Sequence, residues 1–269
     1  MIQPTDPSKG STEMDQHGAQ AKVGEVQRPE HWQNPTHTLF QVSTSGALVA
    51  GVYAGMISTG KILQHGDFGL GTFADLDGEM VILEGHVYKV RGTGEVVEVS
   101  GNAEVPFALV TEFAPETDVE IGPVASLEAL GEWCDKHRRS ANLFYALRVD
   151  GLFQSVRTRA VKPPIGQARL VDAAKVQAEF EFSDIKGTLV GIWSPGFSSA
   201  FSVPGYHFHF LSEDHLHGGH LLACAAETLR LRTDVLTDFH LALPENEAFL
   251  KADLSKNSAD ELAYAEQAH

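Results

Sequence analysis

Five histidines lie within the segment 206–220, which reads YHFHFLSEDHLHGGH. His207 and His209 alternate with Phe208 and Phe210, as in a strand whose two faces differ in polarity. On a strand, residues two apart share a face and lie about 6.5–7 Å apart along the chain. The two imidazoles are therefore expected to point the same way, where they can bind one divalent ion.

A third imidazole would complete a catalytic metal site. His220 opens the apolar run HLLACAA, so we expect it on a rigid strand beside the first two histidines, whereas the alternatives His215 and His217 lie in a segment that reads as a loop. Three imidazoles that leave a coordination position open are typical of catalytic zinc. A His-x-His pair alone is more often a half-exposed polar face, and the third histidine and the apolar surroundings are what favour a metal.

The elements that must position these histidines read as short strands with few helices. Strands are predicted over the alternating or apolar runs 38–42, 80–83, 86–90, 95–99, 107–113, 188–193, 200–210, 219–226, 228–236 and 239–242. Helices are predicted over 125–138, 172–179 and 246–250. The pattern indicates a strand-rich α+β protein.

Three further segments are interpreted from their local composition. Segment 65–79, HGDFGLGTFADLDGE, carries four glycines and three aspartates, which predicts loops and turns. Segment 45–55 is apolar, and its periodicity does not separate a strand from a short helix. Asp150-Gly151 lies between the alternating runs 142–149 and 152–161, and this predicts a hairpin turn.

Composition and charge restrict the class of protein. The 269 residues carry 36 acidic and 20 basic side chains, a formal net charge of −16 that repels nucleic acid. Cys134 and Cys224 have no motif spacing and read as free thiols. Residues 1–36 are rich in Pro, Gln, Gly and Ser, which predicts a flexible N-terminal extension. The chain has neither a secretory signal nor an apolar run long enough to cross a membrane, so we expect a cytoplasmic protein.

Four long motifs carry a resemblance to a known family. They are residues 65–79, NLFYALRVDG at 142–151, VRTRAV at 156–161 and GYHFHFLSEDHLHGGH at 205–220. From about Leu39 to Glu266, and with these motifs in this order, the chain resembles acetolactate decarboxylase. The resemblance implies a mixed-sheet domain over 37–165, an antiparallel barrel-like domain over 166–252, and a tail over 253–269 that folds back toward the site. It also implies a homodimer.

The resemblance further implies which residues form the site. The family holds zinc with a His-x-His pair and a histidine eleven residues on, which selects His207, His209 and His220. It also implies three catalytic residues, which are Arg159, Glu79 and Glu266. Arg159 and Thr72 would bind the substrate. Glu261 is a competitor for the tail position. Without the resemblance, Glu79 would read as solvent-exposed, Arg159 as part of a solvated face or an ion pair, and Glu266 as part of a disordered terminus.

The implied reaction explains why such residues are needed. Acetolactate is 2-hydroxy-2-methyl-3-oxobutanoate, and loss of CO2 from C2 sends an electron pair toward the neighbouring ketone. A Lewis acid on the ketone oxygen stabilises the enediolate that develops, which on protonation gives acetoin, the precursor of butanediol. Zn²⁺ or another divalent metal would suffice, with neither thiamine diphosphate nor pyridoxal phosphate. Arg159 would hold the substrate carboxylate or deliver a proton, and the two glutamates would shuttle protons or orient Arg159.

Two other functions fit the histidine pattern. A cupin-like metal-dependent oxygenase or hydrolase also places His-x-His on a barrel strand, and an oxygenase is distinguished by its need for oxygen. A non-catalytic metal-binding module would bind metal and produce no acetoin.

Overall fold

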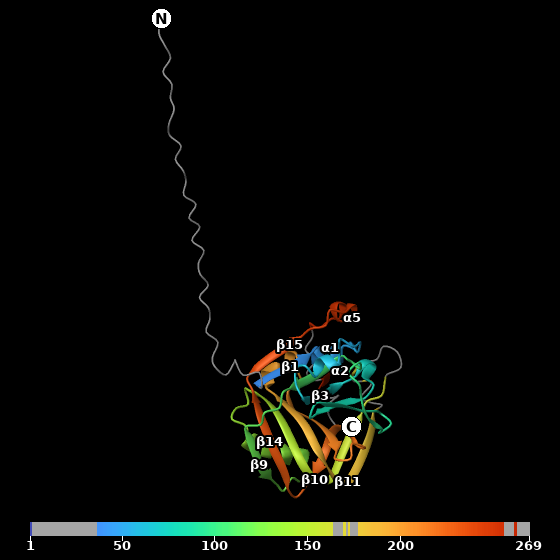
Figure 1. Ribbon diagram of the computed structural model, residues 1–269, viewed down its shortest axis with the longest axis vertical. Coiled ribbons are helices and arrows are strands. Elements are labelled where there is room, and N and C mark those ends of the chain that lie inside the picture. The colour runs from blue at the N-terminus through green and yellow to red at the C-terminus, as the bar shows by residue number, and fades with distance from the viewer. Residues whose placement is uncertain (2–36, 164–168, 171, 173–176, 256–260, 263–269) are drawn as a thin grey trace.

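Two β-sheets make up the body of the protein, as the computed structural model in Figure 1 shows. The structure describes residues 1, 37–163, 169–170, 172, 177–255 and 261–262, so the predicted flexible extension over 1–36 lies almost entirely outside the described residues. Within the described part, no helix is long and apolar enough to span a membrane.

The first sheet has seven strands and is mixed, as predicted. Its spatial order is β15 (Asp238–Ala242), β1 (Thr38–Val42), β8 (Phe107–Thr111), β3 (Phe68–Thr72), β4 (Glu79–Leu83), β5 (His86–Val90) and β6 (Val96–Glu98). The pair β1–β15 is parallel, and the other neighbours are antiparallel.

The second sheet has six antiparallel strands and closes on itself. Its order is β11 (Ala178–Ser194), β12 (Gly205–Ser212), β13 (Gly218–Ala225), β10 (Phe144–Ala160), β14 (Leu229–Leu236) and β9 (Thr117–Ile121). Because β10 pairs with β11 along one edge and with β13 and β14 along the other, the strands β10, β11, β12 and β13 form a closed circuit. The prediction of a barrel-like antiparallel sheet is confirmed.

The helices whose full bounds lie within the described residues are few and short. They are α1 (Ser45–Val49), α2 (Thr59–Ile62), α3 (Leu127–Lys136) and α5 (Glu247–Lys251), with 3-10 turns at Ala74–Leu76 and Gly196–Ala200 and a small ladder of β2 (Ile57–Ser58) and β7 (Glu104–Val105). The predicted helix within 125–138 is confirmed, and the Ser126 hydroxyl caps it by accepting a hydrogen bond from the backbone N–H of Ala129. The ambiguous segment after residue 44 forms helix α1.

The predicted hairpin at Asp150-Gly151 is wrong, because β10 runs unbroken through both residues. The Asp150 carboxylate accepts hydrogen bonds from Arg148, Arg232 and Thr188, which hold it within the sheet. Gly151 permits close packing, since a Cβ there would lie 2.6 Å from a methyl carbon of Leu229. Both residues therefore satisfy contacts between strands and do not form a turn.

The prediction of loops throughout 65–79 is also partly wrong, because β3 occupies Phe68–Thr72. A Cβ at Gly71 would lie 2.4 Å from the carbonyl oxygen of Phe107 on β8, so the glycine lets two strands approach closely. The predicted helix over 172–179 is wrong at its end, where Ala178 and Glu179 open β11, and residues 173–176 lie outside the described part.

The two sheets pack against each other, and β3 and β4 contact strands of the barrel. An apolar cluster that includes Leu70 and Val81 of the first sheet and Val190 and Leu211 of the second fills the space between them. A second cluster, which includes Phe208 and Phe210, joins side chains of the barrel strands and α3. The alternate residues of β12 therefore face the seven-stranded sheet, and this is the face that carries the histidines.

Strands of the two sheets do not fall into two separate halves of the sequence. Strands β9 and β10 precede residue 165 and belong to the barrel sheet, while β15 returns from the C-terminal part to pair with β1. A division into two domains near residue 165 stays a prediction.

Candidate metal centre and active site

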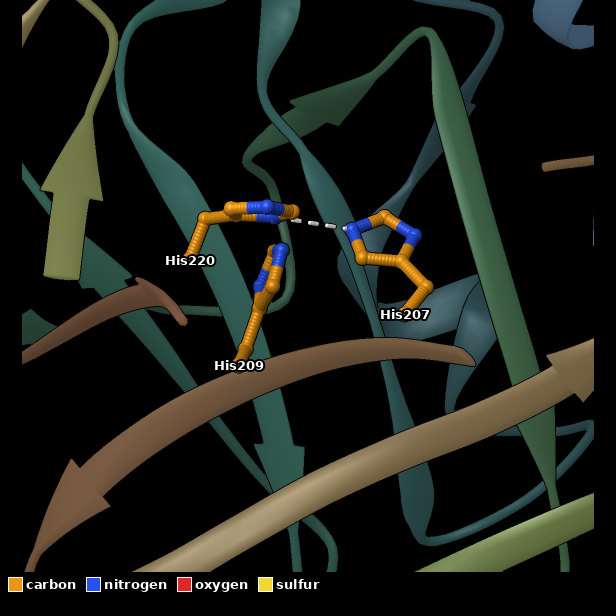
Figure 2. A group of neighbouring side chains, drawn as sticks. All are labelled: His207, His209 and His220. Carbon is orange, nitrogen blue, oxygen red and sulfur yellow. Dashed lines mark hydrogen bonds between the residues drawn. The ribbon is translucent and has the colours of Figure 1, made fainter. Parts of the chain in front are cut away.

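The three predicted histidines meet between the two sheets. His207 and His209 lie on β12, and His220 on β13 is the register partner of His209. Their ring centroids lie 4.9 to 5.4 Å apart, and one nitrogen of each ring lies within 4.8 Å of the others. Figure 2 shows the rings turned toward one another. Among the described residues, this is the one group of three or more potential ligands with such spacing.

The ring nitrogens are arranged as metal ligands require. The Nδ1–H of His209 donates to the carbonyl oxygen of Met80 at 2.7 Å, which leaves the lone pair on Nε2 for an ion. Nε2 of His207 and Nδ1 of His220 lie 3.1 Å apart and share a hydrogen bond (Figure 2). Two nitrogens bound tetrahedrally to one zinc at 2.0–2.1 Å would lie about 3.3 Å apart. The observed spacing therefore fits a shared divalent ion.

Burial keeps His207 neutral. Desolvation, assisted by the charge of Arg159, lowers the pKa of His207 from its usual 6.5 to about 3. Only a neutral imidazole has the lone pair that binds a metal. At neutral pH this ring is therefore ready to bind an ion without first losing a proton.

Register places Arg159 beside the histidines. Arg159 on β10 is paired with His220 on β13, so the two side chains leave adjacent strands on the same face. Its side chain is almost fully buried, and its Nη1 lies 3.9 Å from Oε1 of Glu79 and 3.1 Å from Oε1 of Gln177. A cationic group thus lies within the same buried region as the metal site.

Glu79 and Thr72 come from the opposite sheet. Glu79 shares a face of β4 with Val81, which packs between the sheets, and its Oε2 lies 3.7 Å from Nε2 of His209. Thr72 is the register partner of Glu79 on β3, and its hydroxyl donates to the carbonyl oxygen of Gly78 at 2.8 Å. Both side chains are buried, although composition alone predicted an exposed turn for Glu79.

The three histidines, Arg159, Glu79 and Thr72 line one cavity. Its polar lining comprises Thr72, Glu79, Arg159, His207, His209 and His220, together with Ser45. Its apolar lining is formed by Leu48, Leu76, Phe107, Val161, Leu170, Val203 and Leu262. Such a cavity suits a small acid that carries alkyl groups.

The remaining predictions for the site have different outcomes. Glu266 lies outside the described residues. Its competitor Glu261 forms an ion pair with Arg169, while the adjacent Leu262 lines the cavity. His215 and His217 lie apart from the metal group, with their rings against Tyr88 and Phe182 respectively.

Sequence reasoning did not identify Gln177 or the apolar lining. The helix predicted over 172–179 hid the strand register that brings Gln177 near Arg159. No local motif marks Leu170 or Leu262, because each lies in a short segment whose neighbours in space are distant in sequence.

Comparison with known proteins identifies the family to which this chain is similar. The sequence model of the family described as alpha-acetolactate decarboxylase matches residues 39–256. The alpha-acetolactate decarboxylase of Methanosarcina mazei is 38% identical over 243 residues, which cover 89% of this chain and 83% of that protein. The enzyme of that name from Bacillus licheniformis is 38% identical over 81% of this chain and 87% of its own length.

A solved structure is similar throughout. The crystal structure of alpha-acetolactate decarboxylase from Bacillus subtilis strain 168 superimposes with a TM-score of 0.83 at 33% identity, covering 86% of this chain and all of that one. Both the sequence and the fold of this chain are therefore similar to those of alpha-acetolactate decarboxylases over most of its length. The chain belongs to the alpha-acetolactate decarboxylase family.

Proposed function

We propose that this protein is a zinc-dependent acetolactate decarboxylase that converts 2-acetolactate to acetoin and CO2. Its family membership makes it a carboxy-lyase. The observation that carries the finer proposal is the position of a buried arginine, Arg159, beside three convergent imidazoles in one cavity. That pairing offers a cation for a carboxylate and a metal site for the oxygens of the same small molecule.

The metal fits the residues present. His207, His209 and His220 would hold it, and when bound it supplies Lewis acidity to the ketone oxygen as the C2 carboxylate leaves. Three neutral nitrogens suit zinc and several other divalent ions.

Arg159 would bind and orient the substrate carboxylate. Its planar fork matches a carboxylate, and its burial strengthens the attraction. Arginine stays protonated at every pH at which enzymes work, so we assign it the role of a fixed cation and give proton transfer to a carboxylate.

Glu79 is the described residue placed best for proton transfer. Its Oε1 lies 3.9 Å from Nη1 of Arg159, and its Oε2 lies 3.7 Å from Nε2 of His209. Glu79 therefore lies near both the cation that would bind the carboxylate and a histidine that would bind the metal. It can accept the hydroxyl proton as CO2 leaves and return that proton to C2, after which one further proton from solvent restores the hydroxyl of acetoin. Glu266, predicted from the family motif, would share this task from the C-terminal tail.

The apolar lining would hold the methyl groups and exclude water. Leucine, valine and phenylalanine side chains form this part of the wall, and we expect them to leave C2 open to its proton donor from one direction only. We therefore expect a single enantiomer of acetoin. We also propose a cytoplasmic homodimer that needs neither thiamine diphosphate nor pyridoxal phosphate.

The test compares metal-free protein with protein reloaded with zinc, under anaerobic conditions. Metal content, CO2 and acetoin are measured on the same sample, and chiral chromatography identifies the product enantiomer. We expect turnover that depends on metal and is independent of oxygen. Bound zinc without acetoin would instead favour a metal-binding module, and a strict need for oxygen would favour a cupin-like oxygenase.

A further inference from the structure

Gln177 is a polar residue in contact with Arg159 whose role the proposed function does not explain. It immediately precedes β11, and the register of β11 with β10 pairs Arg159 with Glu179. Residues two apart on a strand share a face, and diagonal neighbours on adjacent strands come within reach of long side chains. Gln177 is thus the diagonal neighbour of Arg159 on the face that carries the guanidinium.

The contact is a direct hydrogen bond. Nη1 of Arg159 donates to the side-chain oxygen of Gln177 at 3.1 Å, whereas the carboxylate of Glu79 lies 3.9 Å from the same nitrogen. Because the guanidinium is planar and rigid, a hydrogen bond to one of its nitrogens restricts the directions of its other N–H groups. The amide of Gln177 therefore contributes to the orientation of Arg159.

The chemistry of the amide suits this position. A carbonyl oxygen accepts from a cation without neutralising it, so Arg159 keeps its full charge for a substrate carboxylate. A second carboxylate at position 177 would compete for the same donors. The side-chain oxygen of Gln177 is the atom that accepts from Arg159, so the amide contacts the cation through its acceptor.

We infer that Gln177 is a positioning residue for the decarboxylation, and that it holds Arg159 in the orientation that binds the carboxylate of a 2-hydroxy-3-oxo acid. This inference rests on the proposed function. Gln177, immediately before β11, would thus affect catalysis through Arg159. The cavity lining does not reveal this role, because Gln177 is not among the residues that line the cavity.

Two substitutions separate the effect of the hydrogen bond between Gln177 and Arg159 from the effect of a charge at position 177. Gln177→Met keeps the length of the side chain and removes the acceptor, so Arg159 should lose its orientation. We expect kcat/KM to fall about tenfold to a hundredfold, the range that loss of a hydrogen bond to a charged group implies, together with a lower enantiomeric excess of acetoin. Gln177→Glu keeps an acceptor and adds a negative charge, so it should mainly raise KM and should preserve the enantiomeric excess.

A matched control lies on the neighbouring strand. Gln154 on β10 is exposed and donates its side-chain N–H to Glu227, remote from the cavity lining. Gln154→Met should leave kcat, KM and the product enantiomer unchanged. All variants should bind one zinc per chain, because none alters a histidine.

Binding provides a readout independent of turnover. The 2,3-dihydroxy acid with the carbon skeleton of acetolactate has no ketone and cannot decarboxylate, yet it keeps the carboxylate. Isothermal titration of the zinc-loaded proteins should show binding weakened about tenfold or more in Gln177→Met, and unchanged in Gln154→Met.

The outcomes distinguish the two levels of the proposal. If the wild-type protein makes acetoin and Arg159→Met does not, but Gln177→Met matches the wild type in kcat/KM, product enantiomer and ligand affinity, the role of Gln177 is overturned and the proposed function stands. If zinc-loaded wild-type protein makes no acetoin, the proposed function fails and the role of Gln177 fails with it.

Discussion

Arg159 on β10 and His220 on β13 are register partners, so a guanidinium and an imidazole of the metal site leave adjacent strands on the same face. Arg159 also acts on a second histidine of the site, because its charge adds to burial in lowering the pKa of His207. The site thus combines a fixed cation with neutral metal ligands, and mutations should separate the two functions.

Arg159→Met should retain the metal and lose turnover. The substitution keeps the apolar part of the side chain and removes the cation that would bind the carboxylate, so we expect kcat/KM to fall by about a hundredfold or more. Metal analysis and an acetoin assay on one sample test this. Arg230→Met is the control, because Arg230 pairs with Asp118 at an exposed position on β14. Loss of zinc from Arg159→Met would show instead that Arg159 is structural.

His209→Ala should lose both metal and activity while the fold persists. Loss of a group that only orients a ligand weakens metal binding about 10–100-fold, and loss of the ligand itself should exceed this. Zinc titration, circular dichroism and the acetoin assay provide the measurements. His217→Ala is matched in chemistry, contacts Phe182 and should behave as the wild type. Wild-type turnover in His209→Ala would refute the ligand assignment.

Asp234 should make stability depend on pH. Burial raises the pKa of this carboxyl from 3.8 to about 6, while His37 lies 3.3 Å away and the backbone N–H of Ala114 donates to it. Between pH 4 and 6 the folded state holds the proton more tightly than the unfolded state. The stability of the wild type relative to Asp234→Asn should therefore fall as pH rises through this window, by at most about 1.4 kcal/mol per pH unit.

Urea unfolding at several pH values measures that difference. Asp118→Asn gives a control of opposite sign, because the hydrogen bond from Arg230 lowers the pKa of Asp118 and its contribution grows as pH rises. A pH-independent difference between wild type and Asp234→Asn would contradict the prediction.

The ion pair between Arg169 and Glu261 should influence the cavity. The adjacent residues Leu170 and Leu262 both line it, so the pair joins two segments that form part of its wall. The partners are 56% and 39% exposed, and such pairs contribute at most about 1 kcal/mol, so Arg169→Glu should raise KM no more than about fivefold.

Exchange of the two charges should restore the wild-type KM. In Arg169→Glu/Glu261→Arg the attraction is re-formed with the same leucines in place. The similarly exposed pair Arg230–Asp118 serves as the control, and its exchange should leave KM unchanged throughout. If the exchanged pair behaves no better than Arg169→Glu alone, the ion pair does not position the wall.

Glu266→Gln should reduce turnover far more than Glu261→Gln. Glu261 already has a partner in Arg169, whereas the family motif assigns a catalytic carboxylate to Glu266. Steady-state kinetics of both variants, each with its zinc content measured, decide between them. Equal loss in the two variants would leave the motif assignment without support.

Much of the site was predictable because strand periodicity is regular. Alternation in 206–210 predicted that His207 and His209 would share a face, and the structure confirms this with Phe208 and Phe210 on the other side. Prediction of His220 as the third ligand required knowledge of strand pairing, because its position opposite His209 depends on the register between β12 and β13.

Other parts depended on contacts that a local pattern does not contain. Asp150-Gly151 has the composition of a turn, but three side chains around Asp150 and the packing of Leu229 against Gly151 keep β10 extended. Glu79 follows an Asp-Gly pair and was expected in solvent, yet pairing of β4 with β3 and contact with the barrel bury it. In both cases the tertiary environment outweighs local propensity.

The hydrogen bond from His209 to the carbonyl oxygen of Met80 crosses from the barrel to the seven-stranded sheet. An ion held by the histidines therefore adds to the connection between two layers that also meet through apolar side chains and through the contact of Arg159 with Glu79. Binding to the folded form stabilises it by an amount that grows with the logarithm of the free metal concentration divided by Kd. Because the histidines join the two layers through His209, we expect metal loading to increase the cooperativity of unfolding. The apoprotein should lose protection of its two sheets against hydrogen exchange at different denaturant concentrations, and the zinc form at a single one.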